Sequence, residues 1–192
     1  MEGLDEMTSF RECFIIDFRE WYPDFRVRDY IRHFFFDSGY FAVVCYRLAR
    51  YFQHRKYTPL KKGIPFLPSF FFRLAIAKSG CEISYNADIG KGLIVDHSVG
   101  IVIGGGVKMG KMVKVFSGVT IGGRNLEKYE STAEKRYPSI GDNVVIFSGA
   151  KILGPVTIGD GATIGANSVV IDSVPADATA AGIPAKVITA GG

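Results

Sequence analysis

Residues 83–119 read ISYNAD IGKGLI VDHSVG IVIGGG VKMGKM VKVFSG V, and this stretch decides the fold. Written in sixes, every block opens on isoleucine or valine, from Ile83 to Val119. The period resumes at Ile140 and runs to Val170. An α-helix would scatter these side chains around its axis, and a plain strand would not select every sixth position. A hexapeptide repeat is typical of a parallel β-helix.

In such a fold each hexad forms one side of a three-sided coil, so about eighteen residues complete a turn. The repeats predict about four to five coils with the aliphatic residues inside. Glycine, asparagine and aspartate between them suit the dihedral angles of tight corners. Because each coil covers only its neighbours, the end coils need caps or partners.

A composition of 47% hydrophobic and 22% charged residues is typical of a globular protein. The length of 192 residues suits one β-helix and a smaller accessory region. Residues 1–78 form an α-helical N-terminal domain, with one helix at about 9–21 and another from about 29 that breaks near Ser38–Gly39. Residues 79–192 form the β-helix. The hexads stop over 124–139, which predicts an excursion loop, and a long loop within a regular solenoid is usually functional.

Charge and cysteine content narrow the class of protein. A net charge of +4 does not indicate a nucleic-acid partner. The sequence has an odd number of cysteines, Cys13, Cys45 and Cys81, and their spacing indicates no pairing. This favours a reducing cytoplasm. The most apolar run, 64–77, contains prolines and Arg73 and is too short for a membrane span.

Two features of the N-terminal region each allow two interpretations. From 47 to 62 the sequence has six Lys or Arg residues and no acid, which fits a solvated basic face or a surface for an anionic membrane or glycolipid. The run Phe70–Phe72 fits packing against the β-helix or a neighbouring subunit, or a lipid-facing patch.

The candidate catalytic group is His97, the only histidine of the repeat region. It follows the inward residue Val95 by two positions, so its side chain should project outward. A lone outward histidine is in itself more often a surface residue than a catalyst.

Longer motifs around it are more specific: 92–104, 118–123, 149–154 and 180–186 read GLIVDHSVGIVIG, GVTIGG, GAKILG and AAGIPAK. With these motifs the sequence resembles the serine acetyltransferase family of left-handed β-helix acyltransferases. The resemblance covers about 82–187 well and the helices loosely, where 39–47 resembles the last helical element of that family.

The resemblance implies transfer of an acetyl group from acetyl-CoA to a hydroxyl, at sites between subunits of a homotrimer. An alcohol is a poor nucleophile at neutral pH, so a base must take its proton as it attacks. The resemblance assigns this role to His97. It implies that Glu82, where the family usually has aspartate, orients the imidazole, and that Asp96 contacts the amino group of the acceptor or is a corner residue.

The resemblance also implies the remaining site residues. The backbone N–H groups of Gly122 and Gly123 are candidates for the oxyanion site, since glycine permits close approach. The CoA groove runs along Ser148, Gly149, Ala150, Gly182 and Lys186, with Lys186 as a candidate ligand of the phosphates. No metal is expected.

The acceptor is left open. The excursion loop ends in Arg136-Tyr137-Pro138, where the family has Arg-His-Pro. Arg136 can bind a carboxylate bidentately, as L-serine requires. Tyr137 departs from the pattern and favours a sugar, a polysaccharide precursor or another small hydroxylated molecule.

Two further expectations concern partners. The chain stops soon after Lys186, so no complex with the sulfhydrylase of cysteine synthesis is expected, and pairing of trimers through the N-terminal helices is left open. A reading of another class is a non-catalytic trimeric scaffold. A γ-type carbonic anhydrase would need three histidines around zinc, and the repeat region has only His97.

Overall fold

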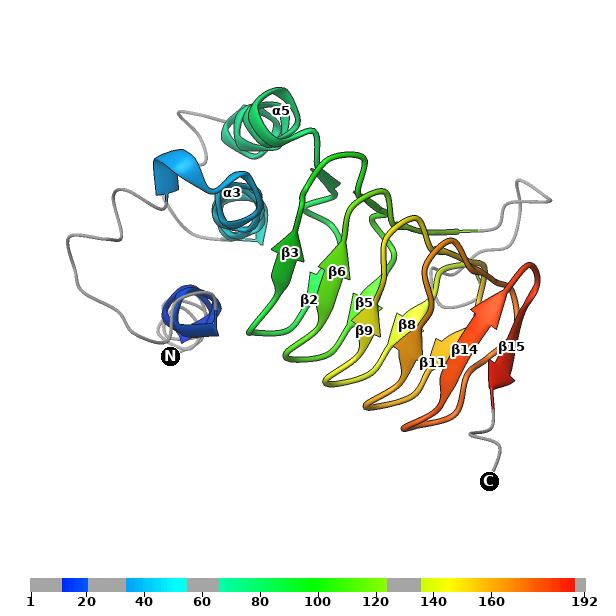
Figure 1. The fold of residues 1–192 in the computed structure, drawn as a ribbon. Coiled ribbons are helices and arrows are strands. Elements are labelled where there is room, and N and C mark those ends of the chain that lie inside the picture. Colours follow the sequence, from blue (N-terminus) through cyan, green and yellow to red (C-terminus); the bar gives the residue numbers. More distant parts are fainter. Residues whose placement is uncertain (1–11, 21–33, 55–65, 124–135, 189–192) are drawn as a thin grey trace.

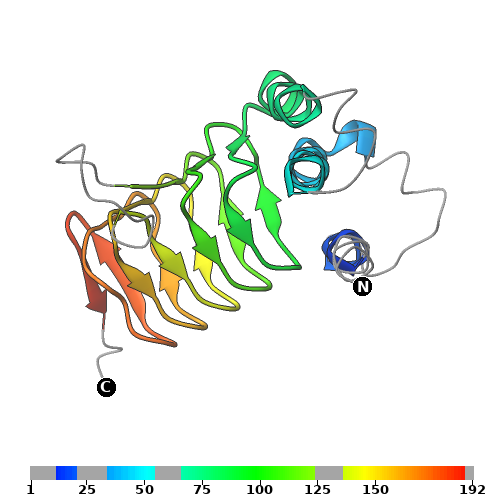
Figure 2. The same ribbon diagram turned by 180° about the vertical axis from the view of Figure 1, so that it is seen from behind.

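A β-helix with helices at one end makes up the protein (Figure 1). The structure, a computed structural model, describes residues 12–20, 34–54, 66–123 and 136–188. The view from behind shows the same arrangement, with the last strands at the end farthest from the helices (Figure 2). The prediction of a left-handed parallel β-helix preceded by helices is confirmed.

Three parallel faces form the wall of the coil. The first face consists of β1 (Glu82–Ile83), β4 (Val102–Ile103), β7 (Thr120–Gly122), β10 (Lys151–Leu153) and β13 (Val169–Val170). The second face consists of β2 (Asp88–Ile89), β5 (Lys108–Met109), β8 (Ser139–Ile140) and β11 (Thr157–Ile158). The third face consists of β3 (Ile94–Asp96), β6 (Lys114–Phe116), β9 (Val145–Ile146), β12 (Thr163–Ile164), β14 (Thr179–Gly182) and β15 (Ala185–Ile188).

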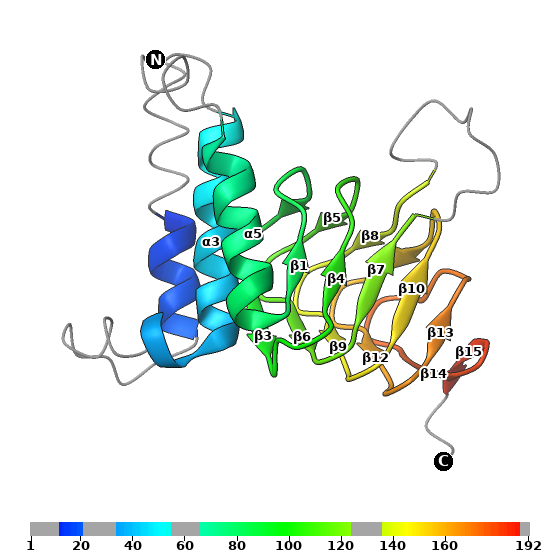
Figure 3. The same ribbon diagram turned by 90° about the horizontal axis from the view of Figure 1, so that it is seen from above.

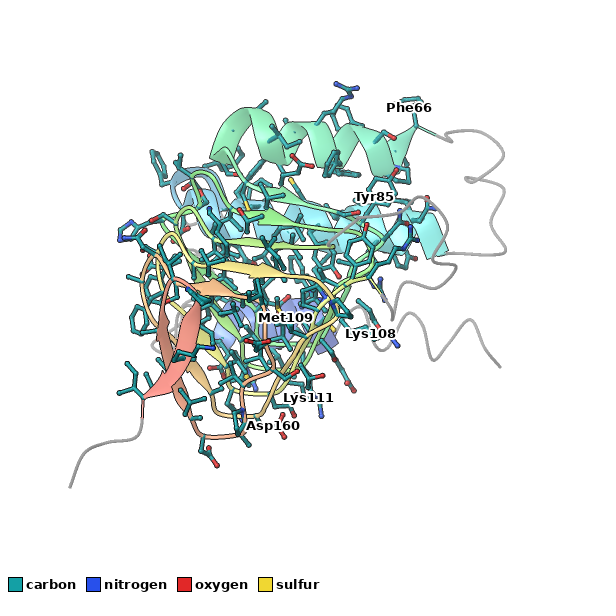
Figure 4. All side chains as sticks on the ribbon, turned by 90° about the vertical axis from the view of Figure 1, so that its right-hand side faces the viewer. Phe66, Tyr85, Lys108, Met109, Lys111 and Asp160 are labelled. Carbon is teal, nitrogen blue, oxygen red and sulfur yellow. The ribbon has the colours of Figure 1, made fainter. Side chains whose placement is uncertain are left out.

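The inward positions are those of the hexad pattern. Every aliphatic residue of the six-residue series is buried, from Ile83 to Val119 and from Ile140 to Val170. They form one continuous core along the coil axis. Figure 4 looks along this axis and shows Met109 inside the coil, with Lys108 and Lys111 pointing outward.

The first coil is longer than expected. Paired residues are twenty positions apart in the first coil, as in Glu82 and Val102, but eighteen apart in the next, as in Val102 and Thr120. The extra two residues lie between β3 and β4. The expected eighteen-residue turn is therefore wrong for this coil, although it holds farther along.

The helices cover the first coil. Residues 12–20 are helical, as predicted, and the rest of that predicted helix lies outside the described residues. Residues 34–36 are helical, and α3 (Ser38–His54) begins after a break at Asp37. The carboxylate of Asp37 accepts the N–H groups of Gly39 and Tyr40, each at 3.0 Å, so this residue caps the helix.

A second long helix, α5 (Leu67–Ser79), was not predicted. Pro68 lies in its first turn, where proline is tolerated because no intrahelical N–H donor is needed there. This helix packs along α3 and leads directly into β1 (Figure 3). The last helix before the coil is therefore α5, and not the segment 39–47 that resembles that element.

Arg47 is buried, and so the basic stretch that starts there is not one solvated face. Its guanidinium forms a two-point ion pair with Asp17, with Nε 2.7 Å from Oδ2, and its Nη1 donates to the Ile89 carbonyl at 2.6 Å. Asp17 also accepts the N–H groups of Gly92 and Leu93. These bonds join the helices to the first coil.

The other end of the coil closes differently. The strand β15 turns back and pairs antiparallel with β14. Across the described ranges, the structure has no helix that is both long and apolar enough to cross a membrane.

Candidate active site

His97 lies at the long corner between the third and first faces. It follows β3 directly, has a left-handed φ of 52°, and exposes 80% of its side chain. Five residues, 97–101, separate Asp96 from Val102, whereas three, 117–119, separate their partners Phe116 and Thr120. The two extra residues make the His97 corner longer than the corners beneath it.

Ser98 fastens this corner to the helical cap. Its hydroxyl is buried, donates to the Ser79 carbonyl at 2.8 Å and lies 2.9 Å from the Ser38 hydroxyl. The N–H of Gly100 donates to the Gly80 carbonyl at 2.9 Å. The helices that close the first coil therefore also fix the backbone beside His97. Sequence reasoning missed Ser98, although it directly follows the Asp-His pair.

The carboxylates lie on either side of the His97 corner. Asp96 is the last residue of β3, and its Oδ1 lies 3.8 Å from His97 Nε2. Glu82 is exposed at the start of β1, on the face into which the corner leads. Among the described residues the structure has no ion pair between Glu82 and His97. The orienting role of Glu82 stays a prediction.

A ridge of small residues runs along the coil axis beside the His97 corner. The Gly118 N–H donates to the Val99 carbonyl and the Gly149 N–H to the Ser117 carbonyl, so Ser117 and Ser148 lie in line below Val99, with their hydroxyls 3.3 Å apart. Pairing of β12 with β9 and β14 adds Ala166 and Gly182 to the same line. With rungs about 4.8 Å apart, the ridge extends roughly 14 Å from Ser117 to Gly182, and its Ser117 end lies next to the His97 corner.

The residues assigned to the CoA groove differ in position. Gly149 has a φ of 75°, and a side chain there would overlap the amide of Asn167, so glycine is required. Lys186 is exposed opposite Ala181 in the hairpin, with Nζ 3.7 Å from the Asp172 carboxylate. Ala150 is fully buried in the coil, so its side chain cannot line a groove. Only its backbone could border the groove, and its assignment stays a prediction.

The other predicted residues lie at the opposite edge of the first face. Gly122 is the last residue of β7 and Gly123 follows it, whereas the His97 corner precedes the neighbouring strand β4. A Cβ on Gly122 would meet no atom within 4 Å, so its backbone is open to close approach. Within one chain the structure therefore does not bring these glycines together with His97.

Tyr137 packs on a run of glycines. A Cβ at Gly104 would lie 3.0 Å from its ring, one at Gly123 3.2 Å, and one at Gly106 would overlap it. The neighbouring Arg136 is half-buried, and its Nε has no hydrogen-bond partner among the described residues. Most of the excursion loop, 124–135, lies outside those residues.

An aromatic pair lies beside the Asp96 column. Phe116 pairs with Asp96 across the sheet, and its ring stacks on that of Phe147 at 5.3 Å and 17°. Phe147 is exposed. In the described part of the chain, no three His, Cys, Asp or Glu side chains gather as metal ligands would.

Comparisons with known proteins agree with this geometry. Residues 137–172 match the bacterial transferase hexapeptide (six repeats) family. A serine acetyltransferase of Helicobacter pylori is 39% identical over 151 residues, which is 79% of this chain and 81% of that protein.

Solved structures give the same result. Soybean serine acetyltransferase complexed with serine aligns with a TM-score of 0.77 and 32% identity, over 94% of this chain and 70% of that one. A serine acetyltransferase in complex with CoA aligns with a TM-score of 0.75 and 30% identity, over 97% and 73%. This chain is therefore an acyltransferase that belongs to the serine acetyltransferase family.

Proposed function

We propose that this protein transfers the acetyl group of acetyl-CoA to a hydroxyl, with His97 as general base. One observation carries the proposal: an exposed imidazole lies on the long corner next to a ridge of small residues about three rungs long. Such a ridge lets an extended pantetheine arm lie against the backbone. The related structure in complex with CoA supports acetyl-CoA as the donor.

The reaction follows from these positions. Neutral His97 accepts the proton of the acceptor hydroxyl while the hydroxyl oxygen attacks the thioester carbonyl. The tetrahedral oxyanion receives hydrogen bonds from the backbone N–H groups of Gly122 and Gly123. Collapse breaks the C–S bond, and the imidazolium returns the proton to the departing CoA thiolate. Glu82 holds the tautomer of His97 in which the nitrogen facing the acceptor is unprotonated.

A second copy of the chain completes the site in this proposal. His97 and the Gly122–Gly123 segment lie at opposite edges of the first face, so one chain cannot apply both to one substrate. Side-by-side packing of β-helices around a three-fold axis brings the His97 edge of one copy to the glycine edge of the next. We therefore infer a homotrimer with three shared sites.

L-serine is the acceptor that the family supports best. A related structure is complexed with serine. The guanidinium of Arg136 suits the carboxylate and Asp96 suits the amino group. Both groups are needed to place the serine hydroxyl at the base.

The stacked rings of Phe116 and Phe147 favour a second acceptor. An exposed aromatic surface next to Asp96 matches a pyranose, whose apolar face packs on a ring while its hydroxyls donate to a carboxylate. Under this alternative the chemistry at His97 is unchanged, and the acceptor is a sugar.

A cytoplasmic location fits the three free thiols, Cys13, Cys45 and Cys81.

Release of CoA from acetyl-CoA tests both acceptors, with L-serine and a panel of pyranosides compared at equal concentration. We expect His97→Ala to lower kcat by 10²- to 10⁴-fold while CoA still raises Tm. Lys111→Ala, at a different corner, should leave both readouts unchanged. Normal turnover by His97→Ala would refute the proposal, and with no CoA-induced shift in Tm the scaffold reading would replace it.

A further inference from the structure

The helix α5 is apolar on both sides. Its inner side packs on the cap and the first coil: Phe71 stacks on Phe52 at 5.9 Å and 3°, and Phe72 meets the Tyr85 ring edge-on at 5.9 Å. This confirms packing as the role of two of the three phenylalanines in the 70–72 run.

The outer side carries a second set of large apolar groups. Phe66, Phe70 and Leu74, four residues apart, expose 61%, 49% and 37% of their surface. They form what we term the α5 stripe. Figure 4 shows Phe66 at the start of this helix, pointing away from the β-helix. No described residue covers the stripe. Three large apolar side chains that line up on one exposed side of a helix form a patch of the kind that marks an interaction site, so a partner surface is implied.

The charge around the stripe identifies the kind of partner. The helix α5 has two charged residues, Arg73 and Lys78, which are both basic and exposed, and it has no Asp or Glu. Arg73 is exposed on the same outer side as the stripe. A surface that combines exposed rings with cations and lacks acids is complementary to an anionic, partly apolar surface.

A second copy of the chain in a two-fold contact fits this surface poorly. A two-fold contact places the same patch of both copies together, so cation would face cation without an acid to pair with. Phosphate groups of an anionic bilayer neutralise those cations, and the acyl chains below them accept the rings.

We infer that the α5 stripe binds the interfacial region of a membrane that contains anionic lipid. A thirteen-residue helix, about 20 Å long, lies flat on the surface with its rings at the acyl boundary. The contact is peripheral. It leaves the His97 corner free, because the stripe occupies the outer side of α5 and the corner attaches through Ser79 at the end of that helix. The inference does not depend on the proposed acceptor.

The test is co-sedimentation of the full chain with vesicles of phosphatidylcholine alone or mixed with phosphatidylglycerol. We expect binding to the mixed vesicles, at least tenfold weaker binding to phosphatidylcholine alone, and release at high salt. Phe66→Ser/Phe70→Ser/Leu74→Ser should weaken binding at least tenfold and leave turnover of soluble substrates within twofold. Ile188→Ser removes an exposed apolar group at the other end and should bind as wild type does.

A charge variant keeps the test decisive if the triple variant fails to fold. Arg73→Glu leaves every apolar side chain in place and should still weaken binding severalfold. Absence of binding to the mixed vesicles would overturn the inference, and so would equal binding to both vesicle types. A triple variant that lowers the mass of the assembly would also overturn it, since a second copy would then cover the stripe.

Discussion

The two ends of the β-helix are closed by different means. At the N-terminal end, helices reach the first coil through buried polar bonds: Arg47 joins Asp17 and the Ile89 carbonyl, and the Tyr46 hydroxyl donates to the Ala87 carbonyl at 2.9 Å. At the C-terminal end, the chain only folds back as the hairpin of β14 and β15, whose Val187 and Ile188 are exposed. The buried bonds of the first closure fix the position of the helices on the coil, whereas the hairpin mainly ends the sheet.

The difference teaches what the cap is for. His97 lies in the first coil, on the one long corner of its ridge, and the bonds of Ser98 tie that corner to the cap. The corners below it have three residues and carry small side chains. If His97 is the general base, as we propose, its end needs polar bonds of fixed geometry, whereas the other end needs only to shield its last rung.

Arg47→Ala should produce the largest loss of stability. It leaves the Asp17 carboxylate buried without its cation, which costs about 3–5 kcal/mol. Burial alone lowers the pKa of Arg47, but Asp17 raises it above its ordinary value, so the guanidinium is charged. Urea unfolding measures the loss. Arg50→Ala, at a half-exposed pair with Asp88, should cost less than about 1 kcal/mol. Equal losses would mean that the buried pair does not hold the cap.

Deleting Ser98 and Val99 makes the His97 corner as short as the others. We expect the coil to persist, because three-residue corners already serve its other rungs, while acetyl transfer falls at least 100-fold because the imidazole moves. Circular dichroism and CoA release measure the two effects. Retained turnover would show that the length of this corner is irrelevant to catalysis.

The hexads predicted the interior well but concealed this corner. Ile101 and Ile103 are both buried, so a six-residue series can pass from one inward column to the other without interruption. Ile83 pairs with Ile103 in the next coil, whereas the six-residue series would place Ile101 at that position. The insertion shows only in the strand register, which depends on contacts twenty residues apart.

The cap and the completed site were less predictable. Pro65 and Pro68 interrupt the apolar run and obscure α5, although Pro68 fits its first turn. Arg47 looked like part of a solvated face because its partner lies thirty residues earlier. His97 was found from its isolation and its motif. The distance between His97 and Gly122 depends on which edge of the first face each corner occupies. The local sequence pattern does not give that information.

Ser98→Ala tests the tie between corner and cap at smaller scale. It removes a buried hydroxyl and leaves the Ser79 carbonyl unpaired, at a cost of about 2 kcal/mol. We also expect kcat to fall severalfold with KM for acetyl-CoA unchanged. Ser117→Ala, at a half-buried contact one rung below, should cost less than about 0.5 kcal/mol. If the two variants behave alike, the cap does not position the corner.

Alkaline pH should weaken the N-terminal end selectively, because its buried thiols have no counterpart in the hairpin. Burial raises the pKa of Cys45 to about 12 and that of Cys81 to about 12, the latter also through repulsion by Glu82. Between about pH 9 and pH 12 the unfolded thiols ionise while the folded ones stay neutral. Stability is thus complete below pH 9 and falls by about 1.4 kcal/mol per thiol for each unit above it. Urea unfolding from pH 8 to 10 measures this slope, which should flatten in Cys45→Ala/Cys81→Ala. An unchanged slope in that variant would assign the alkaline loss to other groups and remove this distinction between the two ends.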